Sequence, residues 1–587
     1  MKSFIKNGFA SVSQNMIASI FFLIVFLSFA VHFSFRNKHF QECDSSLAYC
    51  VMYDFPSSAM TFTNTVNKGS SFAPSLSTDT ATKIVNYPLV DHLLKTSLGD
   101  RYNDKKKGTL IKVLTSDTKS PLFYVRSALI FSLMSFNTNL PHFISSAFAI
   151  PLSTTYSFGH GLIYGLISGP NTSYPDFMSR ALVLTLILFH LCVIFVFFTL
   201  RKLGARPLSS ALGSLLLLFS ISMYSYGYHL GSTVWNYTTS AAFLWFVINY
   251  YSIWESRKYL KRTAWLAGIL VFFNYLIVFY WAAFLLSYFL LHRKDIQGDT
   301  NFKKILAFSK SQYPALILIF LCAFLLYPPG QAAKGGMNSI GDLFSFTYYI
   351  VLNIFSWYNK SAIVDSIQFG LATSLCALGL FLRSNRVPKK ENDLFFTMIK
   401  VFFGILLISM ILGLLYYGPS RHLLFAAPFL FILVGLGLDA IFTSFPVGSR
   451  TGIALILLTA MAGFACTRAR INDTIDSTLK IVVDPNVEQV MVNGCSFHLA
   501  YKDWGKNRTV AKTTPTYIKG NTYLSVGEEG RLPISVTEDG FKTEIVHVQD
   551  VQSGIYFTAY NPEHYPWDRQ NGFTAFTFKV LEVPKKH

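Results

Sequence analysis

An arginine stands at the start of a long apolar run in the C-terminal half of the chain. Arg421 follows the segment 416–420, is followed by His422, and no other charged side chain occurs before Asp439. A guanidinium inside a membrane is costly without an anionic partner, about 2.5–3.5 kcal/mol at the centre of a helix. Because guanidinium matches phosphate oxygens in a bidentate fork, the position predicts phosphate binding by Arg421 and His422. Anchoring at the membrane interface is the alternative interpretation.

Carboxylates follow the first apolar run. Glu42, Asp44 and Asp54 lie within a short polar stretch of sequence. A carboxylate near a membrane surface can take a proton from a hydroxyl group or hold a divalent cation. The three residues are therefore candidate catalytic groups, and solvated loop carboxylates are the alternative. The cofactor stays open at this point, with a divalent cation as the candidate.

Further basic and aromatic residues precede later apolar runs. Lys119 and Arg126 flank Pro121 at one such entry, where Arg126 either reaches lipid headgroups or binds a ligand phosphate. A belt at the outer membrane interface is expected from five aromatic residues, Tyr224, Tyr226, Tyr228, Trp235 and Tyr237. The residues predicted to line a substrate cavity are Tyr49, Tyr124, Tyr228, His229 and Trp235.

Composition indicates a polytopic α-helical membrane protein. Hydrophobic residues are 52% and charged residues 14% of 587, against about 25% charged in a soluble domain. Apolar runs of the bilayer-spanning length predict about 11–13 membrane helices. The formal charge of +19 is concentrated in short loops. This is the positive-inside pattern, so it predicts membrane topology and contact with membrane lipids rather than nucleic-acid binding.

The chain divides into four predicted parts. The first is a transmembrane helix (1–34), interpreted as uncleaved, in which Lys2 and Lys6 precede the apolar run from Met16 to Phe33. The second is an extracytoplasmic loop with the acidic residues (35–121). A multi-helix membrane domain (122–467) follows, with a hairpin expected to turn near Asn274 and Tyr275. The tail (468–587) alternates in hydropathy, which predicts a β-rich domain. The basic loops and helix parity place the N-terminus in the cytoplasm and the tail outside it.

The seven cysteines give little information about the structure. Cys192, Cys322, Cys376 and Cys466 lie in apolar runs and are expected to be small core residues. Cys43 and Cys50 lie in the first extracytoplasmic loop, an oxidising compartment, where both a disulfide and two free thiols remain open.

Several motifs, in a shared order, resemble the GT-C glycosyltransferases of the protein mannosyltransferase and aminoarabinose transferase type. The similarity spans about residues 15–470 and rests on short segments that lie on matching sides of the predicted membrane. These segments are Asp44 after the first helix, Ser120-Pro121-Leu122-Phe123-Tyr124, Phe177-Met178-Ser179-Arg180-Ala181, Arg201-Lys202-Leu203-Gly204-Ala205-Arg206, Trp265-Leu266-Ala267-Gly268-Ile269-Leu270, and Ser420-Arg421-His422-Leu423-Leu424 followed by Pro428. Lys119 stands where that family has a histidine, and the acidic motif is reduced to Asp44-Ser45.

The resemblance implies transfer of a sugar from a polyprenyl-phosphate-linked donor to an unknown extracytoplasmic acceptor. Asp44 would act as the base, and Arg421, with Arg126 or Lys119, would hold the lipid phosphate. Three other functions stay open: a transporter or flippase for lipid-linked substrates, a polymerase or ligase of lipid-linked glycans, and an inactive membrane scaffold.

Overall fold

The structure is a computed structural model of the chain. It describes residues 2–35, 78–88, 91–92, 95, 107–108, 111, 141–153, 157–170, 172, 174–220, 223, 232–253, 256–294, 308–322, 354–355, 362–381, 389–411, 421–478, 487–492, 509–510, 518–528, 541–551 and 573–583.

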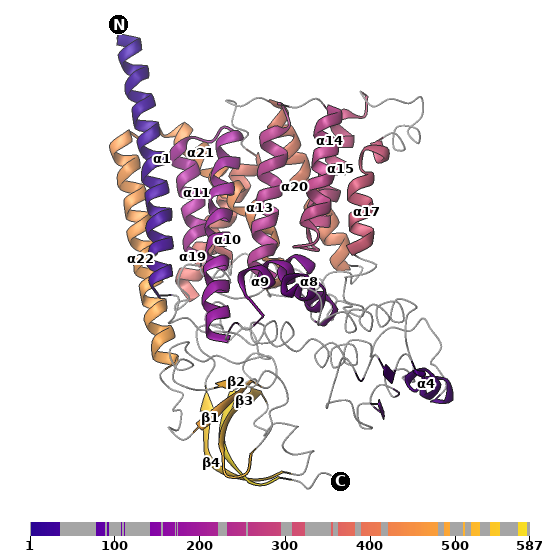
Figure 1. Ribbon diagram of the computed structural model, residues 1–587. Helices are drawn as coiled ribbons and strands as arrows, with labels where there is room; N and C mark the ends of the chain where they lie inside the picture. The colour runs from indigo at the N-terminus through magenta and orange to yellow at the C-terminus, as the bar shows by residue number, and fades with distance from the viewer. Residues whose placement is uncertain are drawn as a thin grey trace.

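Helices dominate the described residues and pack side by side as a bundle (Figure 1). A short helix outside the bundle is α4 (Thr78–Val85). The helices of the first half are α1 (Lys2–Phe35), α8 (His142–Ser153), α9 (Phe158–Ile167), α10 (Tyr174–Lys202), α11 (Pro207–Phe219), α13 (Ser232–Tyr250), α14 (Ser256–Leu270) and α15 (Ile277–His292). Those that follow are α17 (Tyr313–Leu321), α19 (Ala362–Phe381), α20 (Lys389–Ile411), the 3₁₀ helix η5 (Arg421–Ala426), α21 (Ala427–Ser444) and α22 (Ser449–Thr478).

Within the described residues, five helical segments are long and apolar enough to cross a membrane. They are Asn15–Ser34, Ser179–Lys202, Lys390–Ser409, Leu423–Ser444 and Ser449–Arg468. The α21 segment is central, with 78% of its most apolar window buried, whereas the α22 segment, at 28%, lies at the edge of the bundle beside α1 (Figure 1). The chain is thus a membrane-associated helical protein.

The hairpin predicted near Asn274 and Tyr275 is confirmed. Helix α14 ends at Leu270, α15 begins at Ile277, and the turn between them is pinned to α13. The Asn274 amide nitrogen donates to Asn236 O (3.0 Å) and to Thr239 Oγ1 (2.9 Å), and its oxygen accepts from Leu276 N (2.9 Å). These bonds satisfy an amide that is buried in an apolar bundle.

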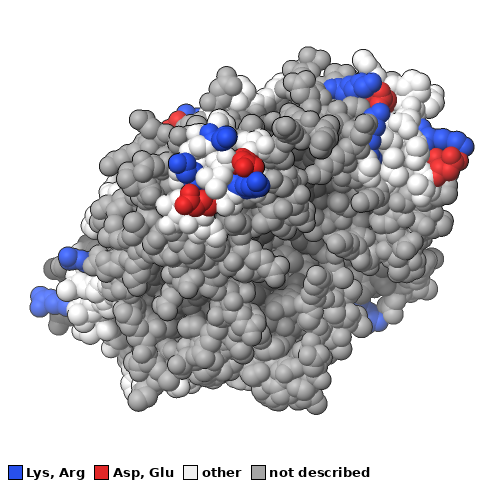
Figure 2. Space-filling model, turned by 90° about the horizontal axis from the view of Figure 1, so that it is seen from below, with Lys and Arg blue, Asp and Glu red and all other residues white. Residues whose placement is uncertain are grey.

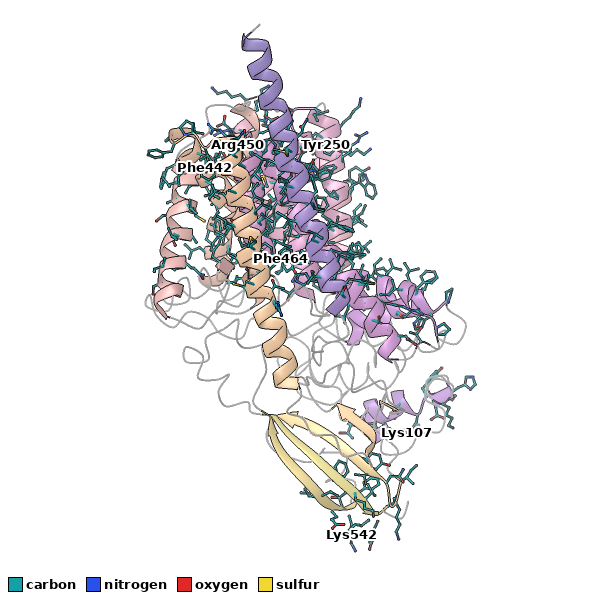
Figure 3. The ribbon with its side chains drawn as sticks, turned by 90° about the vertical axis from the view of Figure 1, so that its left-hand side faces the viewer. Lys107, Tyr250, Phe442, Arg450, Phe464 and Lys542 are labelled. Carbon is teal, nitrogen blue, oxygen red and sulfur yellow. The ribbon has the colours of Figure 1, made fainter. Side chains whose placement is uncertain are left out.

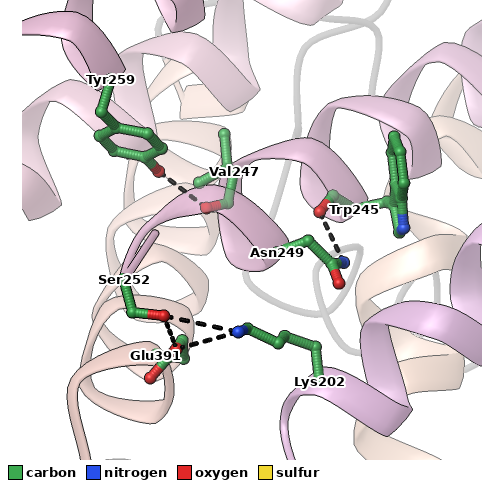
Figure 4. Close-up of polar contacts among 7 residues, drawn as sticks. All are labelled: Lys202, Trp245, Val247, Asn249, Ser252, Tyr259 and Glu391. Carbon is green, nitrogen blue, oxygen red and sulfur yellow. Dashed lines mark hydrogen bonds and ion pairs between the residues drawn. The ribbon is translucent and has the colours of Figure 1, made fainter. Parts of the chain in front are cut away.

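We name the two ends of the bundle after Lys202 and Trp235. At the Lys202 end, Asp439 Oδ1 of α21 accepts hydrogen bonds from Arg206 N (2.8 Å) and Ser209 Oγ (3.0 Å). There Lys202 of α10 also forms an ion pair with Glu391 of α20 (Figure 4). At the Trp235 end, α8 and α9 cross beneath the bundle (Figure 1).

Glycine permits a close helix contact between α19 and α21. A Cβ atom on Gly379 of α19 would lie 2.1 Å from Leu433 O of α21, and one on Gly437 would lie 2.1 Å from Leu375 O. Both distances are far inside van der Waals contact with backbone atoms. The seam between α19 and α21 therefore requires glycine at both positions.

The tail contains a five-stranded mixed sheet in the order β2-β1-β3-β5-β4. Its strands are β1 (Val487–Val492), β2 (Thr509–Val510), β3 (Thr522–Glu528), β4 (Lys542–Val551) and β5 (Phe573–Glu582). Pairs β1–β2 and β1–β3 are parallel, and β3–β5 and β4–β5 are antiparallel. Tyr523 and Phe578 are register partners and both are buried. The strands predicted from alternation near 543–548 and 575–580 are confirmed as parts of β4 and β5.

The sheet lies beyond the end of α22, away from the N-terminus of α1 (Figures 1 and 3). Helix α22 continues to Thr478, so it passes the domain boundary predicted at residue 467. Its apolar part ends at Arg468, and its last turns are polar. Hydropathy located the end of the apolar segment, whereas backbone hydrogen bonding carries the helix further.

Some of the described charges on the sheet side lie next to opposite charges. Figure 2, viewed from below, shows groups of adjacent blue and red side chains as well as isolated blue ones. Lys542 pairs with Glu582 across β4 and β5 (2.9 Å), and Lys83 pairs with Asp79 in α4 (2.6 Å).

Candidate functional site

Most of the residues predicted to do chemistry lie outside the described residues. Those that do are Glu42, Asp44, Tyr49, Asp54, Lys119, Tyr124, Arg126, Tyr228 and His229. Cys43, Cys50, Tyr224 and Tyr226 lie outside them as well. Arg421, His422 and Trp235 are the members of the set that can be placed, the first two by their backbone. Their predicted roles remain predictions.

Arg421 is the first residue of η5, at the point where the apolar run enters the bundle. The 3₁₀ turn packs against α13 and continues into α21, where Pro428 stands in the first turn, a position that needs no backbone N–H. Tyr280 of α15 fixes the turn, because its hydroxyl donates to Phe425 O (2.6 Å) and its ring stacks on Phe429 (4.9 Å between centroids). The backbone that carries Arg421 is therefore held by two neighbouring helices.

Trp235 is buried near the start of α13, with 6% of its surface exposed. Its ring stacks on Phe273 (5.4 Å, 17° between planes) and meets His160 edge to face (5.1 Å, 68°). Its Nε1 has no hydrogen-bond partner among the described residues. A buried indole N–H usually has one, so this donor is an unsatisfied polar group inside the bundle.

The predicted aromatic belt is wrong for Trp235 and Tyr237. Tyr237 is fully buried, and its hydroxyl donates to Met223 O (3.3 Å). A belt residue faces lipid headgroups, whereas both of these rings pack inside the bundle. Spacing in the sequence placed them correctly at one end of a helix but did not show which way they face.

His160 connects Trp235 to the α8–α9 pair. Helix α9 begins after Ser157, whose N–H donates to His160 Nδ1 (3.2 Å) and whose hydroxyl lies 2.5 Å from the same nitrogen. Because a backbone N–H can only donate, Nδ1 is the acceptor of this ring. The ring is thus oriented by the helix cap. Gly159 N donates to Phe272 O (2.6 Å), which ties α9 to the α14–α15 turn.

Glycine and arginine position α9 at its other end. A Cβ on Gly161 would lie 2.2 Å from Ser146 O of α8, so the two helices touch at backbone distance. The guanidinium of Arg180 in α10 donates to Ile167 O (2.9 Å), a terminal carbonyl of α9. His142 Nε2 lies 3.5 Å from Ser168 Oγ in the same turn. The α8–α9 pair is therefore fixed to α10 as well as to the α14–α15 turn.

The Trp235 end is thus a packed unit of aromatic rings, one oriented imidazole and η5. Sequence reasoning missed His160 and placed Asn274 only as a turn residue, although Ser157 three residues before His160 is a recognisable helix-cap spacing. Within the described residues, no group of three or more His, Cys, Asp or Glu side chains is arranged to hold a metal ion. The divalent cation stays a prediction that belongs to the acidic segment.

Comparison with protein-family models, with curated proteins and with solved structures finds no match for this chain.

Proposed function

We propose that this protein is a membrane glycosyltransferase of the GT-C type, which moves a sugar from a polyprenyl-phosphate-linked donor to an acceptor outside the cytoplasm. The acceptor is a glycan, a lipid or a protein. The proposal includes the multi-pass arrangement, a cytoplasmic N-terminus and an extracytoplasmic tail with the β-sheet. The residues that carry it are Arg421 and Asp44.

The position of η5 supports the proposal most directly. Arg421 starts a 3₁₀ turn held by Tyr280 and α13, at the same end of the bundle as the Trp235 unit. A fixed backbone reduces the entropy lost when a long arginine side chain grips a ligand. At a membrane edge, the ligand that best matches a guanidinium is a phosphate group attached to lipid.

The arrangement of charges supports the proposed orientation. Arg201, Lys202 and Arg206 cluster at the Lys202 end, which is also the end from which the N-terminal part of α1 projects (Figure 1). Clustered basic residues in short loops are typical of the cytoplasmic side. The sheet lies beyond the opposite end of the bundle (Figure 3). We therefore propose that this end, with the reaction site and the tail, is the extracytoplasmic one.

In the proposed mechanism, the acceptor hydroxyl attacks the anomeric carbon of the donor sugar. Asp44 takes the hydroxyl proton, while the bond between that carbon and the phosphate oxygen breaks through an oxocarbenium-like state. The bonding electrons leave with the phosphate oxygen. Arg421, assisted by Arg126, Lys119 and His422, stabilises this negative charge.

The test is binding and transfer by Arg421→Ala, with Arg450→Ala as the matched control. Arg450 is exposed near the start of α22 at the Lys202 end (Figure 3), so it changes the same charge away from the site. The probe is a photo-crosslinking polyprenyl phosphate in lipid nanodiscs. We expect Arg421→Ala to lose crosslinking and Arg450→Ala to keep it.

The second arm separates binding from chemistry. Asp44→Asn should retain crosslinking to the polyprenyl phosphate but lose transfer of a labelled sugar to membrane acceptors. Losing one group that acts in the transition state costs about 100–1000-fold in rate. Crosslinking that survives in Arg421→Ala, or transfer that survives in Asp44→Asn, would contradict the assignment.

A further inference from the structure

One face of α14 changes from charged to aromatic to aliphatic along the helix. The helix begins shortly after Ser252, which binds Glu391 at the Lys202 end of the bundle. Lys261 is exposed, Trp265 follows at 45% exposure and Ile269 at 51%. Residues spaced by four lie on one face, with about 6 Å of rise between successive members. This face therefore presents an ammonium group at the end of the bundle and apolar groups further in.

Helix α17 packs beside α14 and runs in the same direction. Gln312 Nε2 donates to Leu260 O (3.4 Å), and further along, a Cβ on Gly268 would lie 2.7 Å from Leu318 Cδ1. Later residues of α17 thus meet later residues of α14, so both helices begin at the Lys202 end. The pair lies at the side of the bundle away from α1 and α22 (Figure 1).

Lys310 lies just before α17 and is exposed, as Lys261 is on α14. The contact between Gln312 and Leu260 brings them near each other, because Lys310 precedes Gln312 by two residues and Lys261 directly follows Leu260. Seven residues after Lys310, and hence on the same face, Ile317 is exposed as well. Two lysines therefore flank one contact between helices, and each is followed by exposed apolar side chains.

The charge on these two segments has one sign. Residues 256–270 include four basic and no acidic residues, and Lys310 is the only charged residue of 308–322. Lys258 and Arg262 are exposed on α14 on either side of Lys261. Like charges repel, and an anion that binds among them offsets this repulsion. At a membrane surface, the headgroup of an acidic phospholipid is an anion of this kind.

We propose that α14 and α17 form a binding site for an anionic phospholipid of the leaflet at the Lys202 end. Lys261 and Lys310 donate hydrogen bonds to the headgroup phosphate, and Trp265 packs at the level of the glycerol backbone. The acyl chains lie along Ile269 and Ile317. A lipid fits this surface better than free phosphate, because apolar surface adjoins both lysines. The site goes beyond the proposed sugar transfer and does not depend on it.

The test is native mass spectrometry of the full chain in detergent, titrated with phosphatidylglycerol or with phosphatidylcholine of the same acyl chains. We expect phosphatidylglycerol to bind more tightly, and this preference to weaken as salt is added. Glycerol 1-phosphate carries the charge without the acyl chains, and it should not displace the bound lipid. Displacement by glycerol 1-phosphate would show that the site recognises phosphate alone.

Matched variants separate a lipid site from the general charge of this end. Lys261→Gln and Lys310→Gln should each weaken binding of phosphatidylglycerol about fivefold, the loss expected for one basic residue at a membrane surface. Lys261→Arg keeps the charge and should retain the binding. Arg450→Gln removes one exposed charge at the same end, on α22 at the other side of the bundle, and should leave the binding unchanged.

Two results would overturn the proposal. One is equal affinity of the wild-type protein for both lipids. The other is an equal effect of Lys261→Gln and Arg450→Gln, which would mean that the lysines act only through overall charge or through membrane topology. Lys310→Gln supplies the same comparison if Lys261→Gln does not fold.

Discussion

Lys202 and Glu391 form an ion pair in which the two side chains differ in their exposure to solvent, and therefore in their contribution to stability. The carboxylate of Glu391 is fully buried and accepts from Ser252 Oγ and from Lys202 Nζ at 3.4 Å (Figure 4). Lys202 retains 27% exposure of its side chain, so its ammonium can reach water. The buried Glu391 carboxylate therefore needs its counter-charge more than the partly exposed Lys202 ammonium does.

We expect Lys202→Met to destabilise the protein more than Glu391→Gln. The first variant leaves a buried carboxylate without its cation, which typically costs about 3–5 kcal/mol. Glu391→Gln leaves a lysine that can turn toward solvent. The glutamine amide at this position can still form a hydrogen bond with Ser252. Thermal unfolding of both variants in one detergent measures the difference. Equal melting temperatures would show that Glu391 has another counter-charge.

At the scale of elements, backbone approach determines how α19 meets α21. Gly379 and Gly437 each bring a helix backbone within reach of a carbonyl on the other helix. The hydrophobic effect contributes little to association between helices that are surrounded by lipid. Close backbone contacts such as these stabilise the pair through dense van der Waals packing instead. The same helix, α19, carries Gly370, where a Cβ would meet nothing within 4 Å.

Alanine at these two positions of α19 should have opposite effects. Gly379→Ala forces α19 and α21 apart and should destabilise the protein by about 1–3 kcal/mol, the usual cost of overpacking. Gly370→Ala has open space and should gain about 0.5–1 kcal/mol from the higher helix propensity of alanine. Chemical or thermal unfolding in matched lipid nanodiscs measures both. A Gly379→Ala variant with an increased free energy of unfolding would contradict this prediction, because it would show that α19 and α21 can move apart without loss of stability.

Hydropathy was sufficient to predict a helical membrane protein and the α14–α15 turn, because an apolar run interrupted by Asn274 is a local signal. It also placed Arg421 at a helix entry. It could not pair the elements, since almost every face of a membrane helix is apolar. The contacts of Glu391 with Lys202 and of His190 with Ser28 therefore had no signal in the sequence. For the same reason, hydropathy could not show that Trp235 faces the inside of the bundle and not the membrane interface.

At the scale of the whole molecule, a helical bundle and a sheet stand at opposite ends of α22 (Figure 3). The two parts are stabilised differently. In the bundle, charges such as Asp439 are buried and hydrogen-bonded. On the sheet, Lys542 and Glu582 form an exposed pair between adjacent strands. Exposed pairs add little to stability and are weakened by salt, so the sheet depends on its buried face around Tyr523 and Phe578.

The Lys542–Glu582 pair has a measurable pH signature. The hydrogen bond from Lys542, and then its charge, lower the pKa of the Glu582 carboxyl. A lowered folded-state pKa contributes stability above the unfolded pKa, and this contribution is lost as pH falls through the folded pKa. NMR titration should show the pKa of Glu582 rising toward its ordinary value in Lys542→Met. Lys519→Met removes a weaker charge effect and should raise it less; equal shifts would show that the cross-strand bond does not form.

The bond between Arg206 and Asp439 joins residues 233 positions apart. At about 5–20 residues per second, a ribosome needs roughly 12–47 s to add the intervening chain. During that delay, α11 has been synthesised but α21, whose Asp439 binds the first turn of α11, has not. The growing chain must wait with this helix end exposed to water, lipid or an insertion factor. Nascent chains stopped before residue 439 are consequently expected to be the forms that cellular quality control recognises and degrades.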